Sequence, residues 1–365
     1  MGTISDKLMR IINTKEDIRQ ALISKGYDVP TSIPFKEYAK MISDLPCRVD
    51  SFPDIEGIVA RYSALGLTNE QMATNPVWVD KTGNGHDLQL KNFAWKGMSG
   101  VGGYGDENYQ TFYKFTLDDY VLIASPPGVK HMNFTFRVTG LQPGNKLTLA
   151  FFGTTNTVYG TWDKDGIYTV DADIVEAGKP TYFYNGYGAT RGEFTIEILP
   201  LYPGALVFDG VDDYGTCDNF PILTKEKGYT VVVLRQWDQD FLNTTLTGGL
   251  LSTRNYSTGE GVAFEKIESS NKGYWNLGAG GIIDFAKSPF TWQTSKQYNN
   301  VGILKGDKNH GKPLCVGCGL SGGQQCGRFA IWELVFLDHD ATEEELTKIK
   351  DYFVKTYPWL FPDQA

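Results

Sequence analysis

Residues 206–214 read Leu206-Val207-Phe208-Asp209-Gly210-Val211-Asp212-Asp213-Tyr214, a short apolar run that leads into an acidic turn. An apolar run bounded by glycine and aspartate is typical of a strand followed by a tight turn. The whole chain has a similar texture, with 41 glycines and 13% aromatic residues. We therefore expect many short strands joined by turns rather than long helices.

Two later segments carry the clearest strand patterns. Tyr229–Leu234 and Phe329–Phe336 are rich in β-branched and aromatic residues. Behind them, Thr342–Tyr357 is expected to form a helix, because Thr342 and Glu345 have the spacing of a capping box. The apolar face of that helix consists of Leu346, Ile349 and Phe353.

A second turn-rich stretch lies well upstream of the first. It reads Asp80-Lys81-Thr82-Gly83-Asn84-Gly85-His86-Asp87, and Leu88, Leu90 and Phe93 follow it in alternation. Alternation of this kind predicts a half-buried strand after the turn.

The two turn-rich stretches together resemble the paired signature of laminin-G-like, concanavalin-A-like jelly rolls. The segment Asp340–Leu346 also resembles the closing segment of that family. In ordinary members the two signatures lie close together, whereas here residues 100–203 separate them. The resemblance therefore implies a β-sandwich that carries an insertion. Such an insertion is tolerable because the cost of closing a surface loop grows only slowly with its length.

The predicted organisation is mainly β, with a short helical segment at the N-terminus. Residues 58–99 and 204–365 form the outer sandwich, and residues 100–203 form a smaller inserted β-sandwich, in which alternating residues such as Phe134 and Phe136 mark strands. Residues 47–57 are expected to be a linker.

Residues 1–46 are expected to form three short helices that anchor the chain. Apolar residues recur there at helical spacing. The candidate contact residues are Ile4, Leu8, Ile18, Leu22, Phe35, Tyr38 and Ile42. A segment this short cannot bury much apolar surface alone, so we expect it to dock onto copies of itself or onto a partner.

The segments Thr14–Gly26 and Pro34–Ile42 look like a stretch common in phage tail and fibre proteins. With the jelly-roll motifs beside them, they resemble appendage proteins of crAss-like phages of gut Bacteroidales. The resemblance implies a structural virion protein, a head or tail fibre subunit assembled in the bacterial host cytoplasm. It also implies partners: further copies of the chain, for example in a trimer, and capsid or tail proteins. Host-surface polysaccharide is a further expected ligand. The main alternative is a secreted or cell-surface carbohydrate-binding module without catalysis.

Composition argues against several other classes of protein. The net charge is −9, and no Lys/Arg cluster marks a nucleic-acid-binding face. No apolar run approaches the roughly 18 residues of a membrane span. Five cysteines, an odd number, fit reduced thiols better than a disulfide framework. No cofactor is expected.

Motifs that suggest catalysis are matched only by their letters. Gly100–Gly105 has dinucleotide-type glycine spacing but no helix pattern after it, which favours a turn. Gly319–Gly323 resembles a nucleophile elbow, yet a strand rather than a helix is expected to follow. Glu265 and Glu268 would lie on opposite faces of a strand, unlike the aligned carboxylates of glucanases. The sequence therefore predicts a protein that is not an enzyme.

Two sets of residues remain as ligand candidates, each with a structural alternative. Trp237, Trp275 and Trp292 could stack on sugars or could pack in the core, and glycines around Trp275 favour an exposed loop there. Asp209, Asp212 and Asp213 could bind calcium, although a polar turn beside Tyr214 is favoured. No metal is expected. Besides these two sets, His310 and three cysteines could in principle hold zinc, but we expect the thiols of Cys315, Cys318 and Cys326 to be reduced and metal-free.

Overall fold

The computed structural model confirms a mainly β protein. The chain divides into two compact units, Met1–Asp54 and Ile55–Ala365. In the first unit the structure describes Lys15, Ile18 and Arg19, all helical, and residues 52–54. In the second it describes residues 55–104, 112–115, 120–123, 131–151, 156–173, 181–185, 194–221, 223, 227–242, 248–252, 263–266, 272–275, 282–284, 289–295, 314–320 and 324–362.

The first sheet of the outer sandwich, sheet A, is built around its longest strand, β24. Its strand order is β20-β15-β24-β13-β4, and β1 also pairs with β24. The strands are β1 (Ile58–Ser63), β4 (Gly100–Val101), β13 (Leu206–Asp209), β15 (Thr230–Trp237), β20 (Phe290–Thr294) and β24 (Arg328–Leu337). One edge of β24 pairs with β15, and the other pairs first with β13 and then with β1. Segments far apart in the sequence therefore meet in sheet A.

The second sheet, sheet B, faces sheet A across the main core. Its order is β19-β18-β17-β16-β21-β14-β3-β2, with the pair β22 and β23 beside β16. The strands are β2 (Val77–Trp78), β3 (Leu88–Lys91), β14 (Tyr214–Cys217), β16 (Gly248–Ser252), β17 (Ala263–Lys266), β18 (Lys272–Trp275), β19 (Ile282–Asp284), β21 (Leu314–Val316), β22 (Cys318–Leu320) and β23 (Gln324–Cys326). Leu90 and Val316 of sheet B join Val231 and Phe336 of sheet A in one buried cluster.

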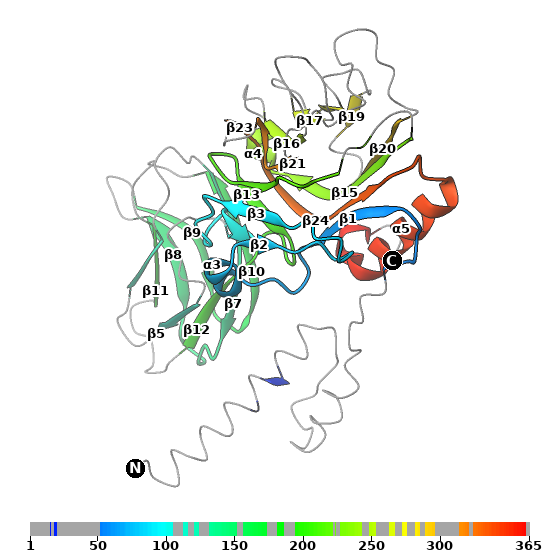
Figure 1. Ribbon diagram of the computed structural model, residues 1–365. Helices are drawn as coiled ribbons and strands as arrows, with labels where there is room; N and C mark the ends of the chain where they lie inside the picture. The colour runs from blue at the N-terminus through cyan, green and yellow to red at the C-terminus, as the bar shows by residue number, and fades with distance from the viewer. Residues whose placement is uncertain are drawn as a thin grey trace, which may run out of the picture. The chain divides into compact units, whose positions relative to one another are not determined.

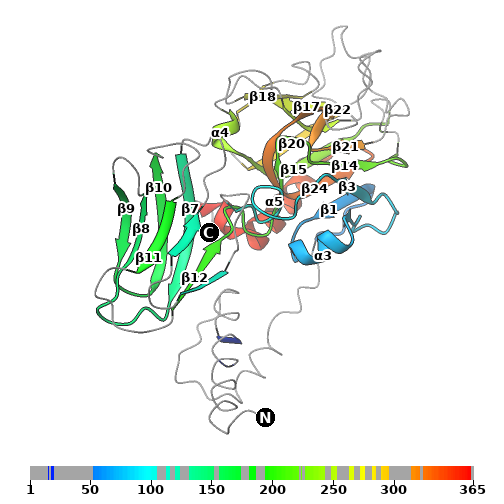
Figure 2. The same ribbon diagram turned by 90° about the vertical axis from the view of Figure 1, so that its left-hand side faces the viewer.

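A helix covers the other face of sheet A. This helix, α5 (Glu343–Thr356), begins at the predicted cap Thr342 and has the complete capping box with Glu345. It lies next to β1 and β24 in both views (Figure 1, Figure 2). Three short helices, α3 (Asn69–Thr74), α4 (Gln239–Leu242) and η2 (Pro358–Leu360), complete the described helices of the outer sandwich.

The eight strands between β4 and β13 pair with one another. They are β5 (Phe112–Phe115), β6 (Tyr120–Ile123), β7 (His131–Thr139), β8 (Leu147–Phe151), β9 (Thr157–Trp162), β10 (Gly166–Asp173), β11 (Thr181–Asn185) and β12 (Phe194–Leu199). The pairs are nested: β8 with β9, β7 with β10, β6 with β11 and β5 with β12. Two further pairings, β7 with β12 and β8 with β11, create two four-stranded sheets. This is the strand pattern of an eight-stranded jelly roll with its own core.

The junction between the two sandwiches lies slightly inside the predicted boundaries. Gly100 and Val101 form β4 and pair with β13, so they belong to the outer sandwich. The chain then runs beside its own return path, because Tyr202 donates its backbone N–H to Gly102 and Leu201 donates to Gly103.

Two glycines of the stretch Gly100–Gly105 have a structural explanation at this junction, and Gly105 lies outside the described residues. Gly102 and Gly103 have φ of 86° and 57°, values that favour glycine. A Cβ on Gly102 would also lie 2.9 Å from Pro200. The stretch predicted to be a turn therefore contains the short strand β4, followed by Gly102 and Gly103, which lie against the returning chain at Leu201 and Tyr202.

The predicted linker also needs correction at its C-terminal end. Ile55 is buried with 7% exposure, and Gly57 accepts a backbone hydrogen bond from Asp338. Residues 55–57 are therefore part of the outer sandwich, since Ile55 leaves water only when it packs against that body.

We expect the insert to be removable. Its two ends are hydrogen-bonded side by side at Gly103 and Leu201, so a short Gly/Ser linker in place of residues 105–199 spans them without strain. The shortened chain should unfold in one sharp transition by circular dichroism. A molten product without such a transition would show that the outer sandwich does not fold as its own unit.

Candidate functional site

The first signature turn is organised around a buried carboxylate. Asp80 is 4% exposed and accepts backbone hydrogen bonds from Arg61 at 3.0 Å, Thr82 at 3.0 Å and His86 at 3.3 Å. The Thr82 hydroxyl donates to both of its oxygens at 2.8 Å. All of these hydrogen bonds come from the protein itself. The Asp80 carboxylate therefore links β1 to the segment before β3 and is not presented to a ligand.

Contacts from the rest of the sandwich hold the same turn in place. The hydroxyl of Tyr62, in the main core, donates to the backbone oxygen of His86. Asn219 donates to the backbone oxygen of Gly85 at 3.1 Å. The signature is thus a structural element that links three separate segments.

The second signature turn has the polar-turn arrangement favoured by the sequence. The Asp209 carboxylate accepts from the backbone of Val211 at 2.8 Å and of Asp212 at 3.4 Å. Fully buried Asp213 accepts from the Ser99 hydroxyl at 3.0 Å and from the backbone of Asp209 at 3.0 Å. The buried carboxylate therefore ties the turn to the segment before β4.

Three acidic side chains meet in this turn. One carboxylate oxygen from each of Asp209, Asp212 and Asp213 lies within 4.8 Å of the others. Burial, followed by the neighbouring charge of Asp209, raises the pKa of Asp213 from 3.8 to about 8. Because the oxygens of Asp213 already accept hydrogen bonds within the protein, its contacts are those of a structural turn.

This raised pKa makes the stability of the protein depend on pH through Asp213. The folded state holds the proton more tightly than the unfolded state. The stability that Asp213 contributes is therefore complete below pH 3.8 and is lost as the pH rises through about 8.

We expect Asp213→Asn to reduce this dependence. At about pH 5 the folded-state Asp213 carboxyl holds its proton, and like the amide of the variant it offers one carbonyl acceptor and one donor, so the two proteins should differ by less than about 1 kcal/mol. Towards pH 8 the unaltered protein should lose stability relative to the variant, because only its unfolded state readily gives up the Asp213 proton. Urea unfolding at both values measures this, with the exposed Asp218→Asn as the matched control. A variant that keeps the full pH dependence of the unaltered protein would contradict the assignment.

The structure corrects the prediction that Cys318 and Cys326 are reduced. The antiparallel register of β22 and β23 sets the two residues opposite each other, and they form a disulfide with a Cα–Cα distance of 4.0 Å. Such a separation lies close to that of a directly opposed cross-strand pair. Cys315 packs against this disulfide as a buried thiol that is not part of a disulfide itself, as predicted.

The glycine-rich stretch Gly319–Gly323 falls in the same hairpin. Strand β22 ends at Leu320 and β23 begins at Gln324, so strands flank it where a nucleophile elbow requires a helix. Ser321 and His310 lie outside the described residues.

Sheet A cannot present its outer face to a ligand at the position of α5. Arg61 donates to Glu333 at 3.1 Å and to the Tyr352 hydroxyl at 3.0 Å, and the Tyr357 hydroxyl donates to Glu333 at 2.7 Å. Glu333 is fully buried, and burial raises its pKa although Arg61 acts in the opposite direction. This ion pair lies between the sheet and α5.

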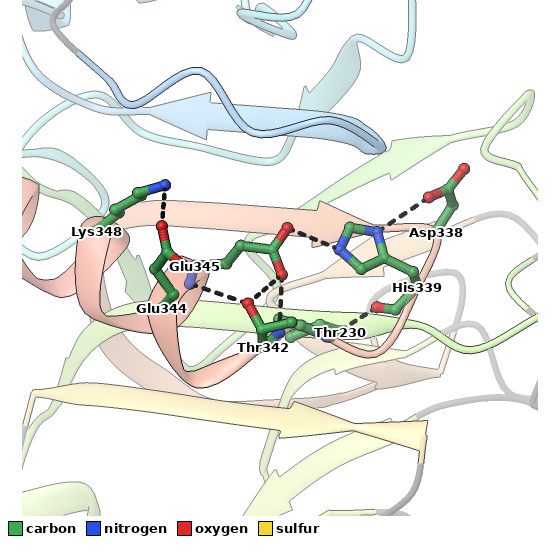
Figure 3. A network of polar contacts seen from close by, with 8 residues as sticks. Thr230, Asp338, His339, Thr342, Glu344, Glu345 and Lys348 are labelled. Carbon is green, nitrogen blue, oxygen red and sulfur yellow. Dashed lines mark hydrogen bonds and ion pairs between the residues drawn. The ribbon is translucent and has the colours of Figure 1, made fainter.

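The start of α5 is fixed by a second polar network (Figure 3). His339 contacts Glu345 at 3.2 Å through Nε2 and Asp338 at 3.3 Å through Nδ1. Burial alone would raise the pKa of Glu345, but hydrogen bonds from Thr342 and His339 outweigh it and lower that pKa. With both ring nitrogens of His339 beside carboxylates, the network caps a helix and leaves no ring nitrogen to act as a base on a hydroxyl.

The outer face of sheet B carries a row of polar residues in register. Gln89, Thr216, Cys315 and Ser252 lie side by side on β3, β14, β21 and β16, but Thr216, Cys315 and Ser252 are buried and only Gln89 of the four is exposed. Next to this row, Lys91 Nζ lies 5.6 Å from the centre of the half-buried Tyr214 ring. The groups that face solvent here are therefore the Gln89 amide and the Lys91 amine, beside the half-buried Tyr214 ring, and they suit contact with a polar ligand.

The three tryptophans proposed as glycan contacts do not share one face. Trp237 is 4% exposed and stacks on Phe241 in the main core, so its ring cannot stack on a sugar. Trp292 is half-buried on the edge strand β20, opposite Val232. Trp275 lies at the end of strand β18 rather than in a loop, and its side chain is outside the described residues.

The anchor residues lie almost entirely outside the described part of the chain. Ile18 is helical and half-buried. Nothing is described for Ile4, Leu8, Leu22, Phe35, Tyr38 and Ile42. Their role stays a prediction. Among the described residues, no helix is long and apolar enough to cross a membrane.

Comparisons with known proteins give no family for this chain. No family model matches it, and no curated protein does. Among solved structures, a Trypanosoma rangeli sialidase in complex with sialic acid is similar over 69% of this chain, with 10% identity and a TM-score of 0.25. The chain spans 54% of that sialidase. The Sulfolobus turreted icosahedral virus structure is similar over 67% of this chain and 98% of its own, with 10% identity and a TM-score of 0.14. At such TM-scores neither likeness supports a conclusion about function.

Proposed function

We propose that this chain is a non-enzymatic subunit of a bacteriophage head or tail fibre. Residues 1–46 attach it to the particle, and the two nested sandwiches form its projecting part. The observation that carries the proposal is the insertion of a complete jelly roll into a second β-sandwich. The two β-sandwiches are joined where the two ends of the insert are hydrogen-bonded to each other at Gly102 and Gly103. Such an arrangement suits a structural subunit on the surface of a particle.

The role of the signature residues agrees with this proposal. Asp80 and Asp213, the buried carboxylates of the two turns, are both occupied by hydrogen bonds from the protein itself. General acid–base catalysis requires a titratable group that can reach a substrate proton. The two buried carboxyl groups of these turns therefore stabilise the fold.

The division of the chain into Met1–Asp54 and Ile55–Ala365 supports a separate attachment segment. On this proposal the subunit is a homo-oligomer, such as a trimer, and contacts capsid or tail proteins. Its place is the virion, after assembly in the bacterial cytoplasm. Weak adhesion to host-surface polysaccharide accompanies the structural role, and many copies make it effective.

A secreted or cell-surface carbohydrate-binding module is the second candidate. The exposed Gln89 and Lys91 on sheet B, beside the half-buried Tyr214 ring, are the observation that favours this alternative. The two candidates differ in the need for residues 1–46, because a free binding module requires no particle attachment.

Particle incorporation separates them. Tagged full-length chain and chain lacking residues 1–46 are each supplied in infected host cells, and particles are purified by density gradient. We expect the full chain in the particle fraction and the truncated chain, still folded, only in the soluble fraction. Equal incorporation of both chains would refute attachment through this segment, and incorporation of neither would favour the binding module.

A further inference from the structure

One outer face of the inserted jelly roll differs from the others in its side chains. On the sheet β6-β11-β8-β9, two rows run in register across β11, β8 and β9 and continue onto Leu122 and Tyr120 of β6, whose side chains lie outside the described residues. The first row is Tyr182, Ala150 and Val158, and the second is Tyr184, Thr148 and Thr161. We call these six residues the tyrosine face. Their neighbours Leu147, Leu149 and Phe183 point the other way, into the core.

The middle strand of the tyrosine face carries small side chains that are almost fully buried. Ala150 and Thr148 on the middle strand are only 1% and 5% exposed, whereas Val158 beside them is 59% exposed. Tyr182 and Tyr184 are half-buried. Tyr182 and Tyr184 lie on β11 beside the smaller Ala150 and Thr148 of β8. Because they are alternate residues of one strand, their Cα atoms are about 7 Å apart.

The chemistry of this face contrasts with the opposite sheet of the same jelly roll. There, Arg137 and Glu197 form an ion pair at 2.6 Å, and the Thr135 and Thr169 hydroxyls lie 2.9 Å apart. The same row also contains Ile167, which is 59% exposed, so the opposite face mixes charged, polar and aliphatic side chains. The six residues of the tyrosine face carry aromatic rings, hydroxyls and methyl groups but no formal charge.

We propose that the tyrosine face binds a neutral polysaccharide. The rings of Tyr182 and Tyr184 stack on successive sugar units, and the exposed hydroxyl of Thr161, which lies 3.4 Å from that of the buried Thr148, exchanges hydrogen bonds with sugar hydroxyls. This inference rests on the adhesive part of the proposed function and moves the contact from the outer sandwich to the insert.

Charge and surface composition decide between this ligand and two other occupants. An acidic polysaccharide would be repelled by a chain of net charge −9 and finds no cation among these six residues. A permanent contact with a second copy requires a broad hydrophobic surface. Here Val158 is the one strongly exposed aliphatic side chain of the six, and its cross-strand neighbour is the small Ala150.

The test is affinity electrophoresis of the full chain through gels that contain mannan, β-glucan or galactan, with heparin as the acidic probe. We expect at least one neutral polymer to retard the wild-type protein and heparin to have no effect. Tyr182→Ala and Tyr184→Ala should each weaken binding about tenfold or more, a difference of about 1.4 kcal/mol. Tyr→Phe at both positions should lose less, because the rings remain.

Thr135→Ala with Thr169→Ala, on the opposite sheet, is the matched control and should bind as the wild type does. Unfolding transitions of all variants check that the jelly roll is intact. Three results would overturn the inference: no retardation by any neutral polymer, undiminished binding by Tyr182→Ala/Tyr184→Ala, or a change of native mass in that double variant, which would make the face a contact between copies.

Failure here leaves the fibre proposal standing, because particle incorporation is measured independently. Binding that persists in the double variant would place the sugar contact elsewhere and retain adhesion. Loss of incorporation from the full chain would instead count against the fibre proposal, whatever the gels show.

Discussion

Glu333→Ala should destabilise the protein by about 3–5 kcal/mol, because it leaves the Arg61 guanidinium buried without its counter-charge. Arg61 is 4% exposed, and Glu333 receives hydrogen bonds from both Arg61 and Tyr357. The loss should appear in the free energy of unfolding from urea titrations.

The matched control is Glu197→Ala, which breaks the partly exposed pair between Arg137 and Glu197. Its side chains are 28% and 43% exposed, and we expect a loss of about 0.2–1 kcal/mol. If Glu333→Ala does not fold, Arg61→Met combined with Glu333→Leu provides the second measurement. This double variant should recover most of the stability, since apolar residues of similar volume replace a buried pair without leaving a charge. A loss from Glu333→Ala as small as that of the control would contradict the buried network.

Asp80→Ala should cost about 3 kcal/mol or more. The substitution removes the acceptor for the backbone N–H groups of Arg61, Thr82 and His86. A buried donor left without a partner costs about 1–3 kcal/mol. Asp80→Asn retains one carbonyl oxygen and should therefore be intermediate. Thermal and urea unfolding of the two variants measure this order.

Asp163→Ala is the control for the loss of one carboxylate, because Asp163 is exposed. Its effect should stay within about 0.5 kcal/mol. Equal stability of Asp80→Ala and this control would mean that the first signature turn does not organise the sandwich.

Local patterns predicted the elements of the outer sandwich well. The segments Tyr229–Leu234 and Phe329–Phe336 correspond to β15 and β24, which pair along most of their lengths at the centre of sheet A. The capping box at Thr342 and Glu345 is present as expected. These signals are readable because each depends on residues a few positions apart.

Features that depend on register between strands were not predicted. Cys318 and Cys326 look like separate thiols until β22 and β23 pair, and the irregular spacing of the cysteines gives no sign of that pairing. The extent of the insert was also missed by a few residues, because β4 is recognisable only through its partner β13.

The tryptophan prediction shows a signal that was available in the sequence. Trp237 follows Val231 and Val233 at even spacing along one strand, and all three lie in the main core. Strand alternation alone points its side chain inward. The tyrosine face, by contrast, needs β11, β8 and β9 side by side, so its residues could not be assembled from the sequence.

The central claim is that this chain is a structural part of a virus particle. Quantitative mass spectrometry of density-purified phage particles, released from host cells that produce the chain, tests it most directly. The account predicts that the chain is present in a fixed ratio to the major capsid protein, with many copies in each particle, and that washing at high salt does not remove it. Its absence from purified particles, together with its accumulation in the medium or on the host cell surface, would contradict the account.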